Sequence, residues 1–136
     1  MKKFFNLIDI NNKNRRRIIA NYLAIETHCL KNWGLEEREN ENDIGFYVPG
    51  KKIKFLTLGG MHNAEFMVLK LSDYMKDYIH QLPKMSKLIK NNKSTRIYDY
   101  ITDVESNTVK EAIDELIPFI CEKRNIKSIA FFAGKF

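Results

Sequence analysis

The chain has 136 residues, a length typical of one globular domain, so residues 1–136 are predicted to form a single domain with one core. Its composition of 44% hydrophobic, 29% charged and 12% aromatic residues excludes an intrinsically disordered chain. The formal net charge is +6 at pH 7, and this excess of basic side chains favours binding to a polyanion.

The positive charge is concentrated in two segments. Residues 1–25 hold six basic side chains and one acidic, and residues 78–98 hold five basic and none acidic, so each carries +5 and the remainder carries −4. Charge segregated in this way attracts phosphates or an acidic protein, although a solubilising surface is the alternative. The predicted nucleic-acid-binding residues are Arg15, Arg16, Arg17, Lys84, Lys87, Lys90, Lys93 and Arg96.

The sequence predicts a cytoplasmic protein without a membrane span. No apolar run approaches the length of about 18 residues that a spanning helix needs. The apolar N-terminal residues are interrupted by Asn6 and Asp9, and no small-residue cleavage site follows, which argues against a signal peptide. Cys29 and Cys121 lie far apart and outside any CxxC or Cys/His cluster, so we expect buried thiols and a reducing compartment.

The first element is a predicted long amphipathic helix over residues 12–33, where apolar residues recur at three- and four-residue spacing and Gly34 follows as the cap. Arg15, Arg16 and Arg17 have the wrong sign for the start of a helix dipole, which leaves them available to a partner or simply solvated. Residues 35–43 are polar and acidic. We expect a loop there, with an edge strand as the alternative.

An antiparallel three-stranded meander is predicted next, over residues 44–48, 53–58 and 65–71. Pro49-Gly50 suits a type II turn, and Gly59-Gly60 is expected to form the second turn. Both faces of these strands look substantially apolar. We therefore expect helices on one face and a dimer partner or the C-terminal tail on the other.

The second half contains two further helical segments and another strand. A helix capped by Ser72 or Asp73 is predicted to stop before Pro83, and a short helix with three outward lysines follows it. A strand is expected over residues 95–101, and a final helix is expected to begin with Thr108 and Glu111 in capping-box spacing. Pro118 should kink or shorten that helix, and the apolar tail 126–136 should pack, for example as a strand.

These elements define the predicted fold class. It is α+β, a single domain whose mainly antiparallel sheet combines the three-stranded meander with at least one further strand. A long N-terminal helix and two further helical segments pack on this sheet.

The sequence contains no motif for a nucleophile, a phosphate loop, a nucleotide fingerprint or a metal, so no catalytic residue, metal or cofactor is predicted. His28 and His80 are expected to be structural or surface residues. Tyr98 and Tyr100 lie close to the second basic segment and can stack on bases. The glycine-rich segment 59–63 is expected to form an ordinary hairpin turn. The alternative is a ligand-binding loop, whose residues are Gly59, Gly60, His62 and Asn63.

The order of the elements over about residues 12–125 resembles that of two small bacterial families, the MmcQ/YjbR-like and the YdhG-like proteins. The resemblance is carried by Ile44-Gly45-Phe46-Tyr47, by Met67-Val68-Leu69-Lys70-Leu71 entering a helix, and by Arg96-Ile97-Tyr98 before the last helix. A tryptophan that precedes the last strand in the first family is missing here. The resemblance implies an α/β fold associated with DNA, an implication by analogy of fold.

Three functions remain open at this point. The leading one is a non-enzymatic module that binds nucleic acid or another polyanion through its basic patches. The first alternative is a protein-interaction or inhibitor module, derived from a mobile element and acting as a homodimer or on an acidic protein. The second is a small-molecule-binding protein or enzyme with a pocket near His62.

Overall fold

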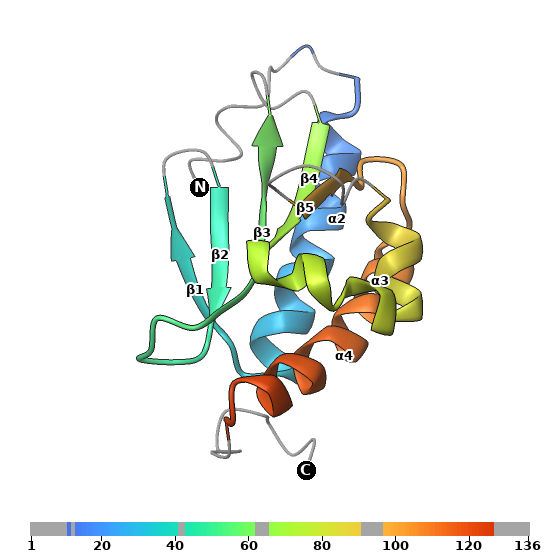
Figure 1. Cartoon of the computed structure of the whole chain (residues 1–136). Helices are drawn as coiled ribbons and strands as arrows, with labels where there is room; N and C mark the ends of the chain where they lie inside the picture. Colours follow the sequence, from blue (N-terminus) through green and yellow to red (C-terminus); the bar gives the residue numbers. More distant parts are fainter. Residues whose placement is uncertain (1–10, 12, 41–42, 62–65, 91–96, 127–136) are drawn as a thin grey trace.

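A computed structural model describes residues 11, 13–40, 43–61, 66–90 and 97–126 (Figure 1). They form one antiparallel five-stranded sheet in the order β1-β2-β3-β4-β5, and helices α2, α3 and α4 lie on one side of it. The predicted single-domain α+β fold with a meander and additional strands is therefore confirmed. The tail 127–136 and the basic residues of segment 1–10 lie outside the described residues.

The strands are β1 (Glu36–Glu39), β2 (Asp43–Tyr47), β3 (Lys54–Met61), β4 (Phe66–Leu71) and β5 (Ile97–Tyr100). Residues 36–39 form the edge strand β1, the alternative to the expected loop, because all four residues pair with β2. The turn predicted at Gly59 and Gly60 is wrong. Gly59 and Gly60 lie inside β3 instead of in a turn, since they pair with Val68 and Met67 of β4.

Cross-strand partners share a face of the sheet, so the register separates its two faces. Ile44, Leu58 and Leu69 form one row on the helix-covered face and are fully buried. The opposite face, called here the outer face, has a row that begins with Arg38 and ends with Tyr98: Arg38, Gly45, Thr57, Lys70 and Tyr98. Phe55, Thr57 and Val68 also lie on this face and are buried, so both faces are substantially covered in this part of the sheet, as the strand sequences predicted.

Helix α2 (Arg15–Thr27) continues into a five-residue π-helix, η1 (His28–Asn32). Ile18, Tyr22 and Ile25 are buried. Ile18 and Tyr22 belong to the apolar stripe that the sequence predicted, whereas Leu23, also expected in that stripe, is 44% exposed. Gly34 has φ of 66° and donates its N–H to the carbonyl of Leu30. This left-handed conformation suits glycine and confirms the predicted C-terminal cap.

The segment after β4 forms two short 3-10 helices, η2 (Asp73–Asp77) and η3 (Ile79–Gln81), where one α-helix was predicted. The short helix α3 (Pro83–Leu88) follows as expected, with Pro83 in its first turn. The first backbone N–H groups of α3 are satisfied from another helix, because Lys84 and Met85 donate to the carboxylate of Glu115.

Helix α4 (Ser106–Lys123) supplies the largest share of the helical core, with seven buried residues along one face. Two details differ from prediction. The helix begins before Thr108 and has Glu105 at its N-cap without a side-chain cap, so the expected capping box is absent. Pro118 neither ends nor shortens the helix, which continues to Lys123. Buried side chains on both sides of Pro118, from Leu116 to Cys121, stabilise the helical conformation there by packing in the core.

None of the helices in the described ranges is long and apolar enough to cross a membrane. Both cysteines are free and buried, as predicted.

Candidate nucleic-acid interface

The basic start of α2 lies against the loop that follows β5. Arg17 forms an ion pair with Asp103, with 2.7 Å between Nη2 and Oδ1, and also donates to Asn14 Oδ1 at 2.9 Å. Lys13 and Arg16 are exposed. The pair between Arg17 and Asp103 therefore places the positive charge of α2 beside the C-terminal end of β5. We call Lys13, Arg15, Arg16 and Arg17 the α2 basic set.

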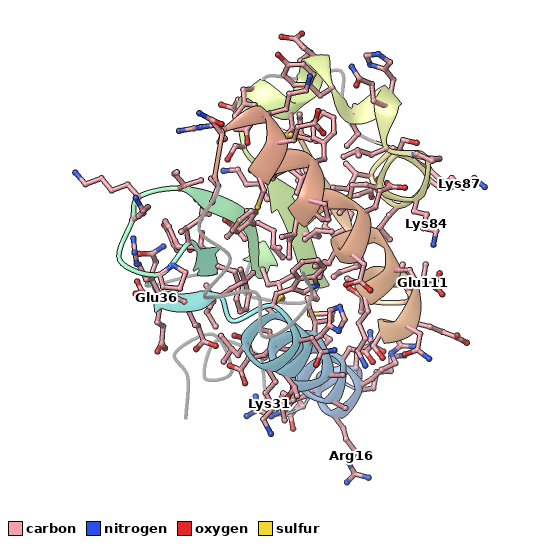
Figure 2. All side chains as sticks on the ribbon, turned by 90° about the horizontal axis from the view of Figure 1, so that it is seen from below. Arg16, Lys31, Glu36, Lys84, Lys87 and Glu111 are labelled. Atoms are coloured by element: carbon pink, nitrogen blue, oxygen red, sulfur yellow. The ribbon has the colours of Figure 1, made fainter. Side chains whose placement is uncertain are left out.

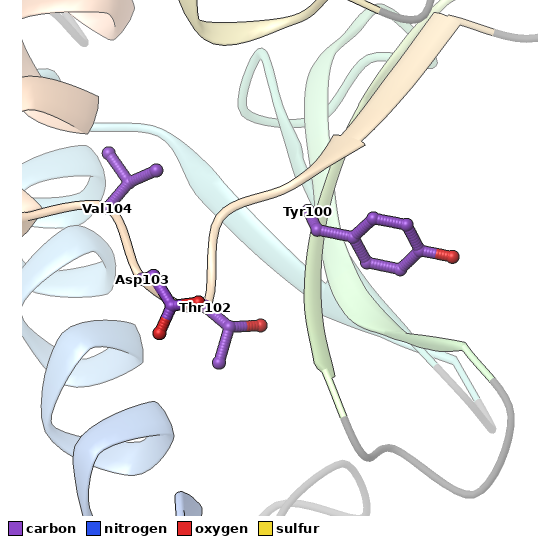
Figure 3. A pocket seen from close by; sticks show the side chains of 4 residues that line it. All are labelled: Tyr100, Thr102, Asp103 and Val104. Atoms are coloured by element: carbon purple, nitrogen blue, oxygen red, sulfur yellow. The ribbon is translucent and has the colours of Figure 1, made fainter.

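Two tyrosines of β5 lie on the outer face of the sheet. Tyr98 is opposite Lys70 and Tyr100 is opposite Val68. Their rings are in an edge-to-face arrangement with centroids 6.3 Å apart. Tyr100 has 44% of its surface exposed and points away from the helical layer (Figure 3). The exposed ring of Tyr100 is a surface on which a base could stack, whereas Val68 opposite it is buried.

A pocket of about 470 Å³ connects these two features. Its described lining comes from the end of β5 and the loop before α4: Tyr100, Thr102, Asp103 and Val104 (Figure 3). Thr102 is buried and its hydroxyl oxygen accepts the N–H of Met67 at 2.8 Å, which fixes this part of the wall to β4. Asp103, the next residue, forms the ion pair with Arg17.

The lysines of the second basic segment occupy a different part of the surface. Lys84, Lys87 and Lys90, here called the α3 lysines, are all exposed. Helix α4 packs against both α2 and α3, and Figure 2 shows its Glu111 between Arg16 and the two labelled α3 lysines. The exposed acidic residues of α4 thus separate the two basic regions. The structure does not bring them together into one continuous patch.

Two predicted residue groups, the second basic segment and the ligand loop, are placed only in part. The backbone N–H of Lys90 donates to Asp99 Oδ2 at 2.8 Å, so the end of α3 lies beside β5. Lys93 and Arg96 lie outside the described residues. In the predicted ligand loop, Gly59 and Gly60 are strand residues, while His62 and Asn63 also lie outside the described residues.

At the other end of the outer face, near β1, a cation lies over an aromatic ring. The Arg38 guanidinium lies 4.1 Å from the centroid of the Tyr47 ring, bonds to Glu36, and donates to the carbonyl of Lys51 at 2.6 Å. The hydrogen bond from Arg38 lowers the pKa of the Glu36 carboxyl, and the N–H of Gly50 adds to the effect. These contacts hold β1 against the turn after β2, so the charge of Arg38 is engaged within the protein.

Sequence reasoning missed a polar network between the π-helix and α4. His28 Nε2 and Trp33 Nε1 both donate to Asp114 Oδ1 at 2.7 Å, and Asn32 Nδ2 donates to His28 Nδ1 at 2.9 Å. His28 is only 8% exposed. The neutral Nε2–H tautomer satisfies both neighbours of the ring. No local pattern indicates this network, because His28 and Asp114 are 86 residues apart.

Burial raises the pKa of Cys29 and raises that of Cys121 to about 11, so neither thiol is activated as a nucleophile. In the described ranges no group of three or more His, Cys, Asp or Glu side chains is placed to hold a metal ion.

Comparisons of the chain with protein-family models, with curated proteins and with solved structures found no match. The resemblance to the two bacterial families therefore stays a prediction.

Proposed function

We propose that this protein is a non-enzymatic module that binds single-stranded nucleic acid at the surface formed by the start of α2 and the end of β5. Phosphates would bind the α2 basic set and bases would stack on the tyrosines of β5. Because most of these contacts involve phosphate and stacking, sequence preference is weak.

One observation supports the proposal: Tyr100, whose surface is 44% exposed, lies three residues before Asp103, and Asp103 forms an ion pair with Arg17 of the α2 basic set. A cationic surface beside a stacking ring is the combination that proteins use for single strands. A duplex needs a broad surface for its two backbones, and the acidic residues of α4 interrupt any surface that spans both basic regions.

The first test compares two charge reversals of equal size. The variant Lys13→Glu/Arg16→Glu changes the α2 basic set, and its control Lys84→Glu/Lys87→Glu changes the α3 lysines; each lowers the net charge from +6 to +2. Fluorescence anisotropy with a short labelled single strand should show a large loss of affinity for the first variant only. The slope of log K against log salt should fall by about 0.7 for each phosphate that the variant no longer binds. Equal losses in the two variants would mean that only the net charge matters.

The second test concerns stacking. Tyr100→Ala should weaken binding by about 5- to 150-fold, since stacking on one aromatic ring contributes about 1–3 kcal/mol, while Tyr100→Phe should retain most of the affinity. Leu23 of α2 is the matched control because it is equally exposed, at 44%. Leu23→Ala should bind like the wild type, and a similar loss for Leu23→Ala and Tyr100→Ala would contradict the role of stacking.

A further inference from the structure

The guanidinium of Arg17 is already occupied in the free protein. Its Nη2 atom lies 2.7 Å from Asp103 Oδ1 and 2.9 Å from Asn14 Oδ1, so both hydrogens of Nη2 are used. A guanidinium has two edges that can hold a phosphate through two parallel hydrogen bonds, one formed by Nη1 and Nη2 and the other by Nε and Nη2. Because each edge needs Nη2, Arg17 binds a phosphate in this bidentate way only after one of the two oxygens has left.

Of the two oxygens, that of Asp103 is the one that a phosphate replaces more readily. An ionised carboxylate repels a phosphate, whereas the neutral amide of Asn14 does not. The side chain of Asp103 is also 82% exposed, so it has room to rotate into solvent. Asn14, in contrast, precedes the first turn of the same helix and can stay bound to Arg17.

The loop that carries Asp103 is anchored on both sides of this residue. The Thr102 hydroxyl accepts the N–H of Met67, and the N–H of Ile101 donates to the carbonyl of Met67 at 2.8 Å. On the other side, Val104 donates its N–H to the carbonyl of Ile101 at 3.1 Å. The backbone therefore holds the carboxylate beside α2, and opening the ion pair requires only the rotation of side chains.

We infer that Asp103 is an internal competitor for Arg17: its carboxylate takes the place of a phosphate in the free protein, and a phosphate of the bound strand displaces it. The inference rests on the proposed function and adds to it a contact that lowers affinity. An exposed ion pair contributes little free energy, so a strand can open this one. The competition therefore weakens binding only several-fold.

The test compares Asp103→Ala with Glu105→Ala in the full chain, by fluorescence anisotropy with a short labelled single strand. Both substitutions remove one exposed carboxylate from the same loop, and Glu105 forms no ion pair within the described part of the chain. Asp103→Ala should tighten binding by about three- to fivefold, as expected for the loss of one competing ion pair. Glu105→Ala should change the affinity by less than about 1.5-fold, since salt screens a charge that makes no direct contact.

The same two substitutions in an Arg17→Ala background identify what Asp103 competes for. Without Arg17, Asp103→Ala should change the affinity no more than Glu105→Ala does, because no guanidinium remains to be released. Circular dichroism of all variants should match the wild type, since Asp103 and Arg17 are on the surface.

Three outcomes would overturn the inference. Equal gains from Asp103→Ala and Glu105→Ala in the chain that keeps Arg17 would mean that net charge alone acts, and would leave the proposed function intact. A loss of affinity in Asp103→Ala would show that the ion pair holds Arg17 in position for a phosphate. If neither the wild type nor any variant binds the strand, the proposed function fails as well.

Discussion

Asp114 is the residue on which the polar network between the π-helix and α4 depends. A single oxygen accepts two hydrogen bonds, from the imidazole of His28 and the indole of Trp33, and both donors are nearly fully buried. Removing the carboxylate leaves two donors without an acceptor, so Asp114→Ala should lower the free energy of unfolding by about 2 kcal/mol. Urea denaturation followed by circular dichroism measures this change.

Glu111→Ala is the control for Asp114, because Glu111 is an exposed residue one turn earlier on α4. The control should change the free energy of unfolding by less than about 0.5 kcal/mol. Equal effects of the two substitutions would show that the network contributes nothing to stability.

The buried thiols lead to a second prediction about single residues. A pKa of about 11 for Cys121, against an ordinary value of 9.0, lowers the thiolate fraction at pH 8 about a hundredfold. Burial raises the pKa of Cys29 as well. Both thiols should therefore react very slowly with a disulfide reagent in the native protein and rapidly in denaturant, and fast reaction of either in the native state would contradict the structure.

The same raised pKa values affect stability in alkali. Above about pH 9 the unfolded chain releases thiol protons that the folded protein retains, so the unfolded state binds fewer protons and stability falls as the pH rises. Below about pH 9 the thiols keep their protons in both the folded and the unfolded state, so their stabilising effect is fully present. Replacing Cys121 by Ala should reduce the loss of stability between about pH 9 and pH 11.

At the scale of elements, α4 contains an internal proline that its packing tolerates. Pro118 is exposed and lacks the N–H that would bond to the carbonyl of Asp114, yet the helix continues to Lys123. Pro118→Ala should restore this hydrogen bond and stabilise the protein by about 2 kcal/mol, a value below the full penalty of proline because the unfolded chain gains entropy. The denaturation midpoint should rise with an unchanged slope, and destabilisation by Pro118→Ala would show that the helix depends on the proline.

The elements also show what the sequence could predict. Periodicity was sufficient for α2, the meander strands and α4, because each has a buried apolar face that repeats along the chain. It failed for β1, where Glu36, Arg38 and Glu39 resemble a loop. That strand exists because β2 offers it a backbone partner and Arg38 stacks on Tyr47. Such stabilisation comes from residues distant in sequence, so no local pattern reveals it.

The candidate site could be predicted only as separate parts. The tyrosines of β5 and the arginines of α2 were recognised as residues suited to nucleic acid. That these two groups lie close together could not be predicted, because their proximity depends on the contact between Arg17 and Asp103, which are 86 positions apart. The pocket could not be predicted either, because it also depends on residues distant in sequence. The hydroxyl of Thr102, one of its lining residues, accepts a hydrogen bond from the N–H of Met67 in β4.

For the whole molecule, the position of α4 decides how the charge can act. The helix lies between α2 and α3 and carries Glu111 and Asp114 on its exposed side. A field of opposite sign between the two basic regions makes them independent surfaces instead of one large patch. Under the proposed function, a short strand occupies only the region near Tyr100, whereas a long strand follows the edge of β5, where the backbone of Lys90 is hydrogen-bonded to Asp99, and reaches the α3 lysines.

This arrangement predicts that the contribution of the α3 lysines depends on the length of the ligand. Lys84→Glu/Lys87→Glu should leave binding of a strand of about 6 nucleotides unchanged, because a site of that size covers only one basic region. The same variant should weaken binding of a strand of about 30 nucleotides and reduce its salt slope by about 0.7 for each phosphate that it no longer binds. Lys13→Glu/Arg16→Glu, in contrast, should weaken both strands. Anisotropy titrations at three salt concentrations separate these cases, and an equal loss of affinity for short and long strands in the α3 variant would show that the two regions act as one surface.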